Sequence, residues 1–167
     1  MESPVYEPRE DSFLLEKYVK EYAKKDSLVL DMGTGSGIQG IAAAKNRATV
    51  ISVDINTKAI AYAKSEAMKE NLKNIKFIQS DLFQNIKQQK FDLIAFNSPY
   101  LPQEDGIENI ALFSKKQGTE ITVRFIKEAR NFLKPDGIIL LITSSLAKIS
   151  KIDEEINSSL LIQKTLE

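Results

Sequence analysis

The sequence predicts an α/β fold: a doubly wound, mostly parallel sheet with helices on both faces. Two observations support this prediction. Short apolar runs alternate along the chain with segments of helical periodicity. Several of the runs, such as residues 138–142, are apolar throughout, which is typical of strands covered on both faces. Alternating strands and helices form parallel sheets, because each helix carries the chain back to the start of the next strand.

The elements follow from periodicity and from punctuating residues. Residues 1–11 are expected to be extended, because a proline disfavours helix at the residue before it, and Asp11 or Ser12 is expected to cap the first helix. We predict helices over residues 12–23, 38–45, 57–69 (with Asn56 as its cap), 119–133 and 146–156. We predict strands over residues 28–31, 49–54, 75–79, 91–96, 138–143 and 160–165, with a turn at 134–137.

Length and composition predict one domain over residues 1–167, and they exclude several kinds of site. The domain comprises an N-terminal segment and helix (1–25), a core (26–143), and a C-terminal helix and short strand (144–167). The residues after 143 leave room for about one strand, so the sheet is expected to lack the last strand of a final hairpin. Basic and acidic residues balance at 23 each, so a broad nucleic-acid surface is not favoured. Without cysteine or histidine the chain has no Cys or His metal site, and we expect no bound metal. No signal peptide or membrane span is apparent, so a cytoplasmic protein is expected.

A glycine-rich turn after the first strand predicts a nucleotide-like ligand. Gly33 and Gly35 lie between the strand and the next helix, where glycine allows close backbone approach and a helix N-terminus offers free N–H groups. The segment Gly35-x-Gly37-x-x-Gly40 also matches a dinucleotide fingerprint. Asp31, just before the turn, instead favours a cationic amino group, as in S-adenosylmethionine. The alternative is an ordinary tight turn.

Two further acids lie where the next two strands end. Asp54 ends the second strand and is placed to accept hydrogen bonds from ribose hydroxyls; alternatively it helps to cap the following helix. Asp81 follows the third strand and is placed to accept from an adenine amino group; alternatively it is a turn residue.

The fourth strand runs into Asn97-Ser98-Pro99-Tyr100. Asn97 is expected at the carboxyl edge of the sheet, where open α/β folds bind ligands. Pro99 keeps Ser98 extended, so that the Asn97 side-chain oxygen and the Ser98 carbonyl can converge on one NH2 group, with Tyr100 as a flat wall. This block predicts recognition of a planar amide or an exocyclic amine. The alternative is a strand exit in which Asn97 is a turn former.

Together these blocks resemble a Rossmann-like class I methyltransferase that uses S-adenosylmethionine to methylate amino groups. Residues 5–15, Val-Tyr-Glu-Pro-Arg-Glu-Asp-Ser-Phe-Leu-Leu, resemble more narrowly the N-terminal signature of HemK-like protein glutamine methyltransferases. The similarity is closest to the archaeal and eukaryotic branch that modifies class 1 translation release factors. It covers about residues 4–143. Ser98 departs from the first proline of the family's usual Asn-Pro-Pro-Tyr block, although its carbonyl remains.

The resemblance implies a reaction, a cofactor pocket and a partner. Methyl transfer to a glutamine amide would take place at Asn97, Ser98, Pro99 and Tyr100. The residues implied for binding S-adenosylmethionine are Ser12, Asp31, Gly33, Gly35, Asp54, Ile55, Asp81, Leu82 and Asn97. A small zinc-binding activator protein is expected to extend the sheet at residues 75–79, where a strand guarded by Lys76 that needs no partner is the alternative.

Three rival functions remain open. An N6-adenine methyltransferase acting on RNA or DNA would grip its adenine amine in the same way, and only this alternative implies a nucleic-acid partner. An NAD-binding oxidoreductase would fit the glycines, although we find no candidate proton donor such as histidine. A non-catalytic module with a methyltransferase-like fold is disfavoured by the presence of Asn97.

Overall fold

The computed structural model describes residues 7–99, 115–143 and 149–158. These residues fall into two compact units. The first comprises residues up to 97 together with 132–142, and the second comprises 98–131 and the residues from 143 onward. The single domain expected over residues 1–167 stays a prediction beside this division.

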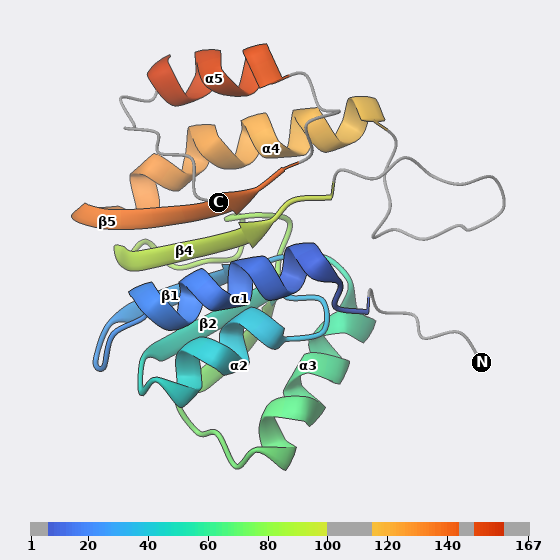
Figure 1. Ribbon diagram of the computed structural model, residues 1–167, viewed down its shortest axis with the longest axis vertical. Helices are drawn as coiled ribbons and strands as arrows, with labels where there is room; N and C mark the ends of the chain where they lie inside the picture. Colours follow the sequence, from blue (N-terminus) through green and yellow to red (C-terminus); the bar gives the residue numbers. More distant parts are fainter. Residues whose placement is uncertain (1–6, 100–114, 144–148, 159–167) are drawn as a thin grey trace, which may run out of the picture. The chain divides into compact units, whose positions relative to one another are not determined.

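The first unit is built on a five-stranded parallel sheet (Figure 1). Its strands are β1 (Leu28–Met32), β2 (Thr49–Asp54), β3 (Ile75–Gln79), β4 (Phe91–Asn97) and β5 (Leu133–Ile142). They lie in the order β3-β2-β1-β4-β5, and every pair is parallel. The chain therefore starts in the middle, moves outward to β3, and then crosses back past β1 to β4. This reversal between β1 and β4 creates the crevice at which open α/β sheets bind ligands.

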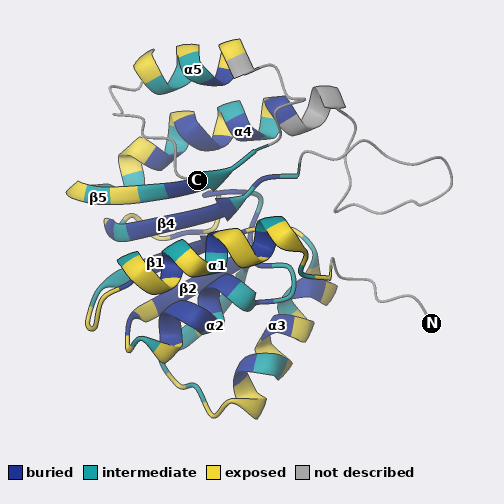
Figure 2. Cartoon of the chain, viewed as in Figure 1, coloured by how far each residue is buried: buried dark blue, intermediate teal, exposed yellow. Residues whose placement is uncertain are grey.

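Three helices cover one face of the sheet. Helices α2 (Ile38–Lys45) and α3 (Thr57–Lys69) connect successive parallel strands in the same direction, so right-handed crossovers place them on the same face. Helix α1 (Glu10–Tyr22) packs beside α2 and contacts β4 and β5 (Figure 1). Burial is continuous along much of the central strands β1 and β4, and Figure 2 shows it for β4. Val29, Leu30, Leu93 and Ile94 are almost fully buried there, as expected for central strands.

Most predicted elements are confirmed, and α2, β2, α3 and β3 have the predicted bounds. Asn56 caps α3 as predicted, since its side chain accepts a hydrogen bond of 2.9 Å from the Lys58 amide. The predicted cap of α1 is wrong. The helix begins at Glu10, its N-cap is Arg9 without a side-chain hydrogen bond, and Asp11 and Ser12 lie within the first turn. The Asp11 carboxylate is instead directed to Asn97.

The predicted turn at residues 134–137 is also wrong, because β5 already begins at Leu133. Its pairing with β4 shifts from Phe91–Leu133 to Leu93–Ile138, so the extra residues form an irregularity within the strand. β5 lies at the edge of the sheet in the described chain, where a proline is tolerated. The Lys134 ammonium pairs with the Asp92 carboxylate at 2.8 Å and fastens this irregular start to β4.

The second unit contains helices α4 (Lys115–Ala129) and α5 (Ile149–Ser158), which pack against each other. An ion pair of 3.6 Å joins Lys127 to Glu155. Both helices are displaced by a few residues from their predicted bounds of 119–133 and 146–156, and a 3-10 turn (Arg130–Phe132) leads from α4 into β5. The strand predicted over residues 160–165 lies outside the described residues.

Candidate functional site

Strand register brings three of the predicted site residues to one level of the sheet. Met32 of β1 lies beside Val53 of β2 and Phe96 of β4. The next residues along these strands, Gly33, Asp54 and Asn97, therefore leave the sheet side by side at its carboxyl edge. The site predicted at this edge thus rests on a backbone framework of hydrogen-bonded parallel strands.

Asp31 anchors this framework from inside. Its side chain is 1% exposed, and its Oδ2 atom accepts hydrogen bonds from the Thr34 hydroxyl, the Gly40 amide at 3.0 Å and the Ser52 hydroxyl at 3.1 Å. These bonds tie β1 to the start of α2 and to β2. Burial raises the pKa of Asp31 to about 6, against the lowering effect of the hydrogen bonds. Its predicted contact with the cofactor ammonium stays a prediction.

Asp54 holds the glycine turn in place. Its two carboxylate oxygens accept from the Gly35 and Asn56 amides, each at 2.9 Å. Burial raises the pKa of Asp54, and the backbone hydrogen bonds oppose that rise. The alternative role of Asp54 near the start of α3 is therefore present in the structure. It does not exclude ribose binding, because a carboxylate has lone-pair sites beyond two hydrogen bonds.

The glycines of the turn differ in what surrounds them. Gly33, Gly35 and Gly37 all have positive φ, which glycine adopts without strain. A Cβ atom on Gly37 would lie 2.9 Å from the Ala63 Cβ, and one on Gly40 would collide with Ser52, so these two glycines permit close packing. A Cβ atom on Gly35 would meet nothing nearer than the Gly33 carbonyl at 3.9 Å. Gly35 is thus the glycine of this turn that borders open space.

The end of β3 reaches the same edge through a hydrogen bond of 2.9 Å from the Ser80 amide to the Asp54 carbonyl. Beyond it, Asp81 accepts from the Gln84 side chain at 3.3 Å, as expected for a turn residue. Leu82 is buried and has a φ of 46°, a strained conformation for a branched side chain. Asp26, Arg47 and Asn71, which precede β1, β2 and β3, also have positive φ, so the predicted role of Leu82 stays a prediction.

The Asn97 amide has a distinct environment at each end. Its Nδ2 atom donates to the Asp11 carboxylate at 2.8 Å. Its Oδ1 atom is buried and has no hydrogen-bond partner among the residues that the structure describes. Sequence reasoning missed Asp11 as a partner, because it lies 86 residues away in the chain. Its place in the Glu-Asp-Ser block was the available signal.

Ser12 and Gln39 form a second contact at the start of α1. The Gln39 Nε2 atom donates to the Ser12 carbonyl at 2.9 Å, and its Oε1 atom is buried without a partner in the described part of the chain. The rest of the predicted substrate block is not assembled here. Ser98 and Pro99 belong to the second unit, and Tyr100 lies outside the described residues.

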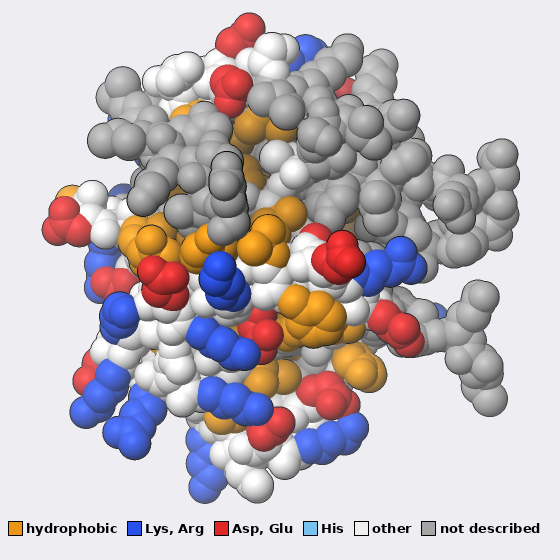
Figure 3. All heavy atoms as spheres, in the orientation of Figure 1, with side chains coloured by type: hydrophobic (Ala, Val, Ile, Leu, Met, Phe, Trp, Pro, Cys, Tyr) orange, Lys and Arg blue, Asp and Glu red, His pale blue; other side chains and the backbone are white. Residues whose placement is uncertain are grey.

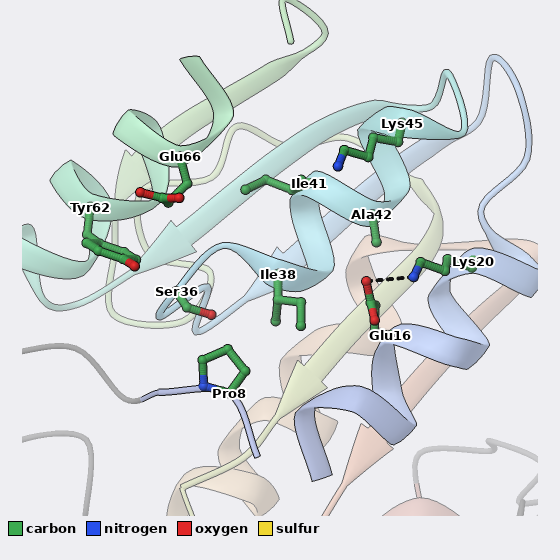
Figure 4. Close-up of a pocket in the computed structure, with 10 residues that line it drawn as sticks. All are labelled: Pro8, Glu16, Lys20, Ser36, Ile38, Ile41, Ala42, Lys45, Tyr62 and Glu66. Atoms are coloured by element: carbon green, nitrogen blue, oxygen red, sulfur yellow. Dashed lines mark ion pairs between the residues drawn. The ribbon is translucent and has the colours of Figure 1, made fainter. Parts of the chain in front are cut away.

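A surface hollow of about 330 Å³ lies elsewhere, between α1, α2 and α3 (Figure 4). Its lining residues are Pro8, Glu16, Lys20, Ser36, Ile38, Ile41, Ala42, Lys45, Tyr62 and Glu66. The ion pair between Glu16 and Lys20 borders it at 2.7 Å. None of the residues predicted for the site is among those that line it, although Ser36 of the glycine turn is.

A family model described as a methyltransferase domain matches residues 23–165. The chain belongs to the methyltransferase domain family. One relative, named "Putative protein N5-glutamine methyltransferase", from Methanocaldococcus jannaschii, is 45% identical over 148 residues, covering 85% of this chain and 73% of the relative. The release factor glutamine methyltransferase of Streptococcus pneumoniae is 36% identical over 140 residues. That match covers 77% of this chain and 50% of the relative, so this chain spans about half the length of the Streptococcus protein.

Solved structures confirm the predicted fold. A ribosomal protein L11 methylase from Lactobacillus delbrueckii has a TM-score of 0.72 at 25% identity and covers 93% of this chain and 71% of that one. The E. cuniculi Mtq2–Trm112 complex, responsible for methylation of the termination factor eRF1, has a TM-score of 0.67 at 23% identity. The match covers 93% of this chain and 84% of that one. Another methyltransferase structure, at 18% identity and a TM-score of 0.71, holds S-adenosylhomocysteine. The match covers 94% of this chain and 42% of that one. The match to the methyltransferase domain family and the named relatives confirm the predicted enzyme class. The methyltransferase structure that holds S-adenosylhomocysteine agrees with S-adenosylmethionine as the methyl donor.

The residues of this methyltransferase fit that cofactor. Gly35 leaves space beside the turn that a larger residue would fill. Ile55, directly after Asp54, is 54% exposed and offers an apolar surface on which a purine can lie. At the end of β4, the buried Asn97 Oδ1 atom has no hydrogen-bond donor among the described residues. Carboxylate, backbone N–H and apolar surface are the groups that ribose, adenine and the methionine moiety require.

Proposed function

We propose that this methyltransferase transfers a methyl group from S-adenosylmethionine to the side-chain amide nitrogen of a glutamine in a translation release factor. The observation that carries the proposal is the buried Asn97 Oδ1 atom without a protein donor among the described residues. A buried acceptor that lacks a hydrogen bond costs about 1–3 kcal/mol, which a bound NH2 group would remove. The names of the Methanocaldococcus and Streptococcus relatives support glutamine as the source of that group.

The chain contributes positioning and electrostatics to this reaction. When bound, the cofactor would supply a methyl group made electrophilic by its sulfonium: the C–N bond would form as the C–S bond breaks, S-adenosylhomocysteine would leave, and the methylated nitrogen would then lose its extra proton to solvent. An amide nitrogen is a weak nucleophile, so holding it in line with the methyl group is worth several kcal/mol. Asn97 would orient the nitrogen by accepting one of its hydrogens, and this hydrogen bond strengthens as the nitrogen gains positive charge. Asp54 would hold the ribose, while the Gly33–Gly35 turn would lie against the methionine moiety.

The remaining site residues keep their predicted roles within this proposal. Ser12, Asp31, Ile55, Asp81 and Leu82 would complete the cofactor pocket, and the Ser98 carbonyl would accept the second hydrogen of the substrate NH2 group. Pro99 would stiffen that backbone, and Tyr100 would form the flat wall beside the amide.

The proposal is tested by incubating the chain, with and without its activator, with labelled S-adenosylmethionine and a class 1 release factor, and by mapping the product with mass spectrometry. We expect one added methyl group on a glutamine. Asn97→Ala should abolish transfer and leave cofactor affinity within about threefold, because Asn97 acts on the substrate side. Equal loss of transfer and of cofactor affinity would contradict the role given to Asn97.

Parallel reactions with RNA, DNA and a ribosomal protein separate the substrate classes. An adenine amine could also donate to Asn97, so methylated nucleic acid would favour the adenine alternative. Charge argues against it: on the face shown in Figure 3, basic side chains are interspersed with acidic ones. Ion pairs such as Lys45–Glu70, at 2.9 Å, further reduce the charge available to bind phosphates.

We also propose that a small activator protein pairs with β3. This strand is an outer strand of the described sheet, so one side of its backbone has no neighbouring strand there. The Asn74 carbonyl and the Ser80 amide bond to β2, and alternation between them turns the backbone groups of Ile75 and Phe77 outward. An added strand would use those groups. The E. cuniculi complex, which contains a partner subunit, supports the proposal.

No helix within the described residues is long and apolar enough to cross a membrane. A release factor substrate would place the protein in the cytoplasm.

A further inference from the structure

The direction of the Asn97 amide is set by Asp11. An amide side chain can point either its oxygen or its NH2 group toward a neighbour. An ionised carboxylate can only accept hydrogen bonds, so the Asn97 Nδ2 atom must face Asp11, from which it lies 2.8 Å away. The Asn97 Oδ1 atom is thereby directed elsewhere, and it is the buried oxygen that has no partner among the described residues.

We propose that Asp11 is a positioning residue for methyl transfer: it fixes Asn97 with its oxygen available to the substrate NH2 group. The role in transfer rests on the proposed function, whereas the fixed orientation stands on the hydrogen bond alone. If the amide were reversed, its NH2 group would face the substrate NH2 group, two donors would meet, and binding in line would be lost.

Asp11 is itself held by the docking of α1. It lies in the first turn of that helix, whose Leu15 and Val19 are buried. The carbonyl of the next residue, Ser12, accepts from Gln39 of α2 at 2.9 Å in a buried contact. The first turn of α1 is thus hydrogen-bonded to α2 through Ser12 and to the end of β4 through Asp11. This double attachment gives the Asp11 carboxylate a defined position.

The charge of Asp11 has a second effect. A hydrogen bond from an amide N–H to a carboxylate polarises the amide and makes its oxygen a better acceptor. With the substrate NH2 group bonded to the Asn97 oxygen, the negative charge would also lie one side chain away from the nitrogen that becomes positive during transfer, which would favour the transition state more than the bound substrate. Asp11 would therefore raise kcat more than it lowers the KM for the glutamine substrate.

The test compares Asp11→Ala, Asp11→Asn and Asp11→Glu with the control Glu10→Gln. Glu10 is an exposed acid in the same helical turn, so its variant removes the same charge without touching Asn97. The side-chain NH2 signals of Asn97, assigned by their loss in Asn97→Ala, are recorded by NMR. Kinetics are measured for glutamine methylation, together with cofactor affinity and thermal stability.

We expect Asp11→Ala to shift the Asn97 NH2 signals and to lower kcat by about tenfold or more, with cofactor affinity within about threefold of wild type. Asp11→Asn, which can present either end of its own amide, should lose part of the rate, and Asp11→Glu should restore part of it. Glu10→Gln should leave both signals and rate unchanged. If Asp11→Ala unfolds the protein, Asp11→Asn carries the comparison, because it has nearly the same shape.

Unshifted Asn97 NH2 signals in folded Asp11→Ala or Asp11→Asn would overturn the inference. So would a rate loss that is matched by Glu10→Gln or that only follows the loss of folded protein. A wild-type chain that methylates no glutamine even with its activator present would overturn the proposed function, and the NMR comparison would still decide whether Asp11 orients Asn97.

Discussion

Acidic side chains near the strand ends are hydrogen-bonded to other groups of the protein in the absence of a ligand. Asp54 holds the Gly35 amide, Asp31 holds the Gly40 amide, and Asp11 holds Asn97. Each acid thus has a structural partner in addition to its predicted ligand role. Such contacts preorganise a site, because the groups that meet the ligand need not be ordered at the moment of binding.

Alanine at Gly35 and at Gly37 should have different consequences. Both positions have positive φ, so either substitution costs about 1–2 kcal/mol of folding stability. Gly37→Ala also forces its Cβ against Ala63, which adds about 1–3 kcal/mol. Gly35→Ala adds no such collision but fills the space beside the turn, so it should weaken binding of S-adenosylmethionine. Urea denaturation and calorimetry measure the two effects, and equal stability losses with unchanged affinity for Gly35→Ala would contradict the account.

Secondary-structure elements near the glycine turn could be predicted closely from the sequence, because local signals coincide there. Asn56 marks the start of α3, and a run rich in β-branched apolar residues marks β2. The errors fall where distant contacts override local propensity. Asp11 has the chemistry of a helix cap, yet its carboxylate is bonded to Asn97. Lys134 begins a typical turn sequence, yet its pairing with Asp92 and the β4 ladder keeps it in a strand.

The outer edge of β3 is where an activator would bind, and backbone chemistry there can be tested with one residue. Phe77→Pro removes an outward N–H group while leaving the bonds to β2 in place, since proline is tolerated on the open side of an edge strand. We expect this variant to lose co-purification with the activator. Phe77→Leu, which keeps the N–H group, should retain it. Equal retention by both variants would place the activator elsewhere.

The stability of the whole molecule should depend on pH through its buried acids. Asp31 ionises at about 3.8 in the unfolded chain and at about 6 in the folded protein, because burial disfavours its charge. Between these values the folded state holds a proton that the unfolded state has released, so this group lowers stability as pH rises. The loss reaches about 3 kcal/mol above pH 6, at 1.36 kcal/mol per unit.

The variant Asp31→Asn isolates this effect. Its lost hydrogen bonds add an offset that does not vary with pH, whereas the ionisation of Asp31 is removed. Urea denaturation between pH 4 and 7 should therefore show the stability of wild type falling relative to that of Asp31→Asn as pH rises. Parallel curves for the two proteins would mean that Asp31 does not carry a raised pKa.

The most direct test of the whole account is a crystal structure of the protein with S-adenosylhomocysteine and a glutamine-containing release factor peptide. We predict that the sulfur lies over the Gly33–Gly35 turn, with the ribose at Asp54 and the glutamine NH2 group donating to the Asn97 side-chain oxygen. A cofactor bound away from these strand ends, or a glutamine that makes no contact with Asn97, would contradict it.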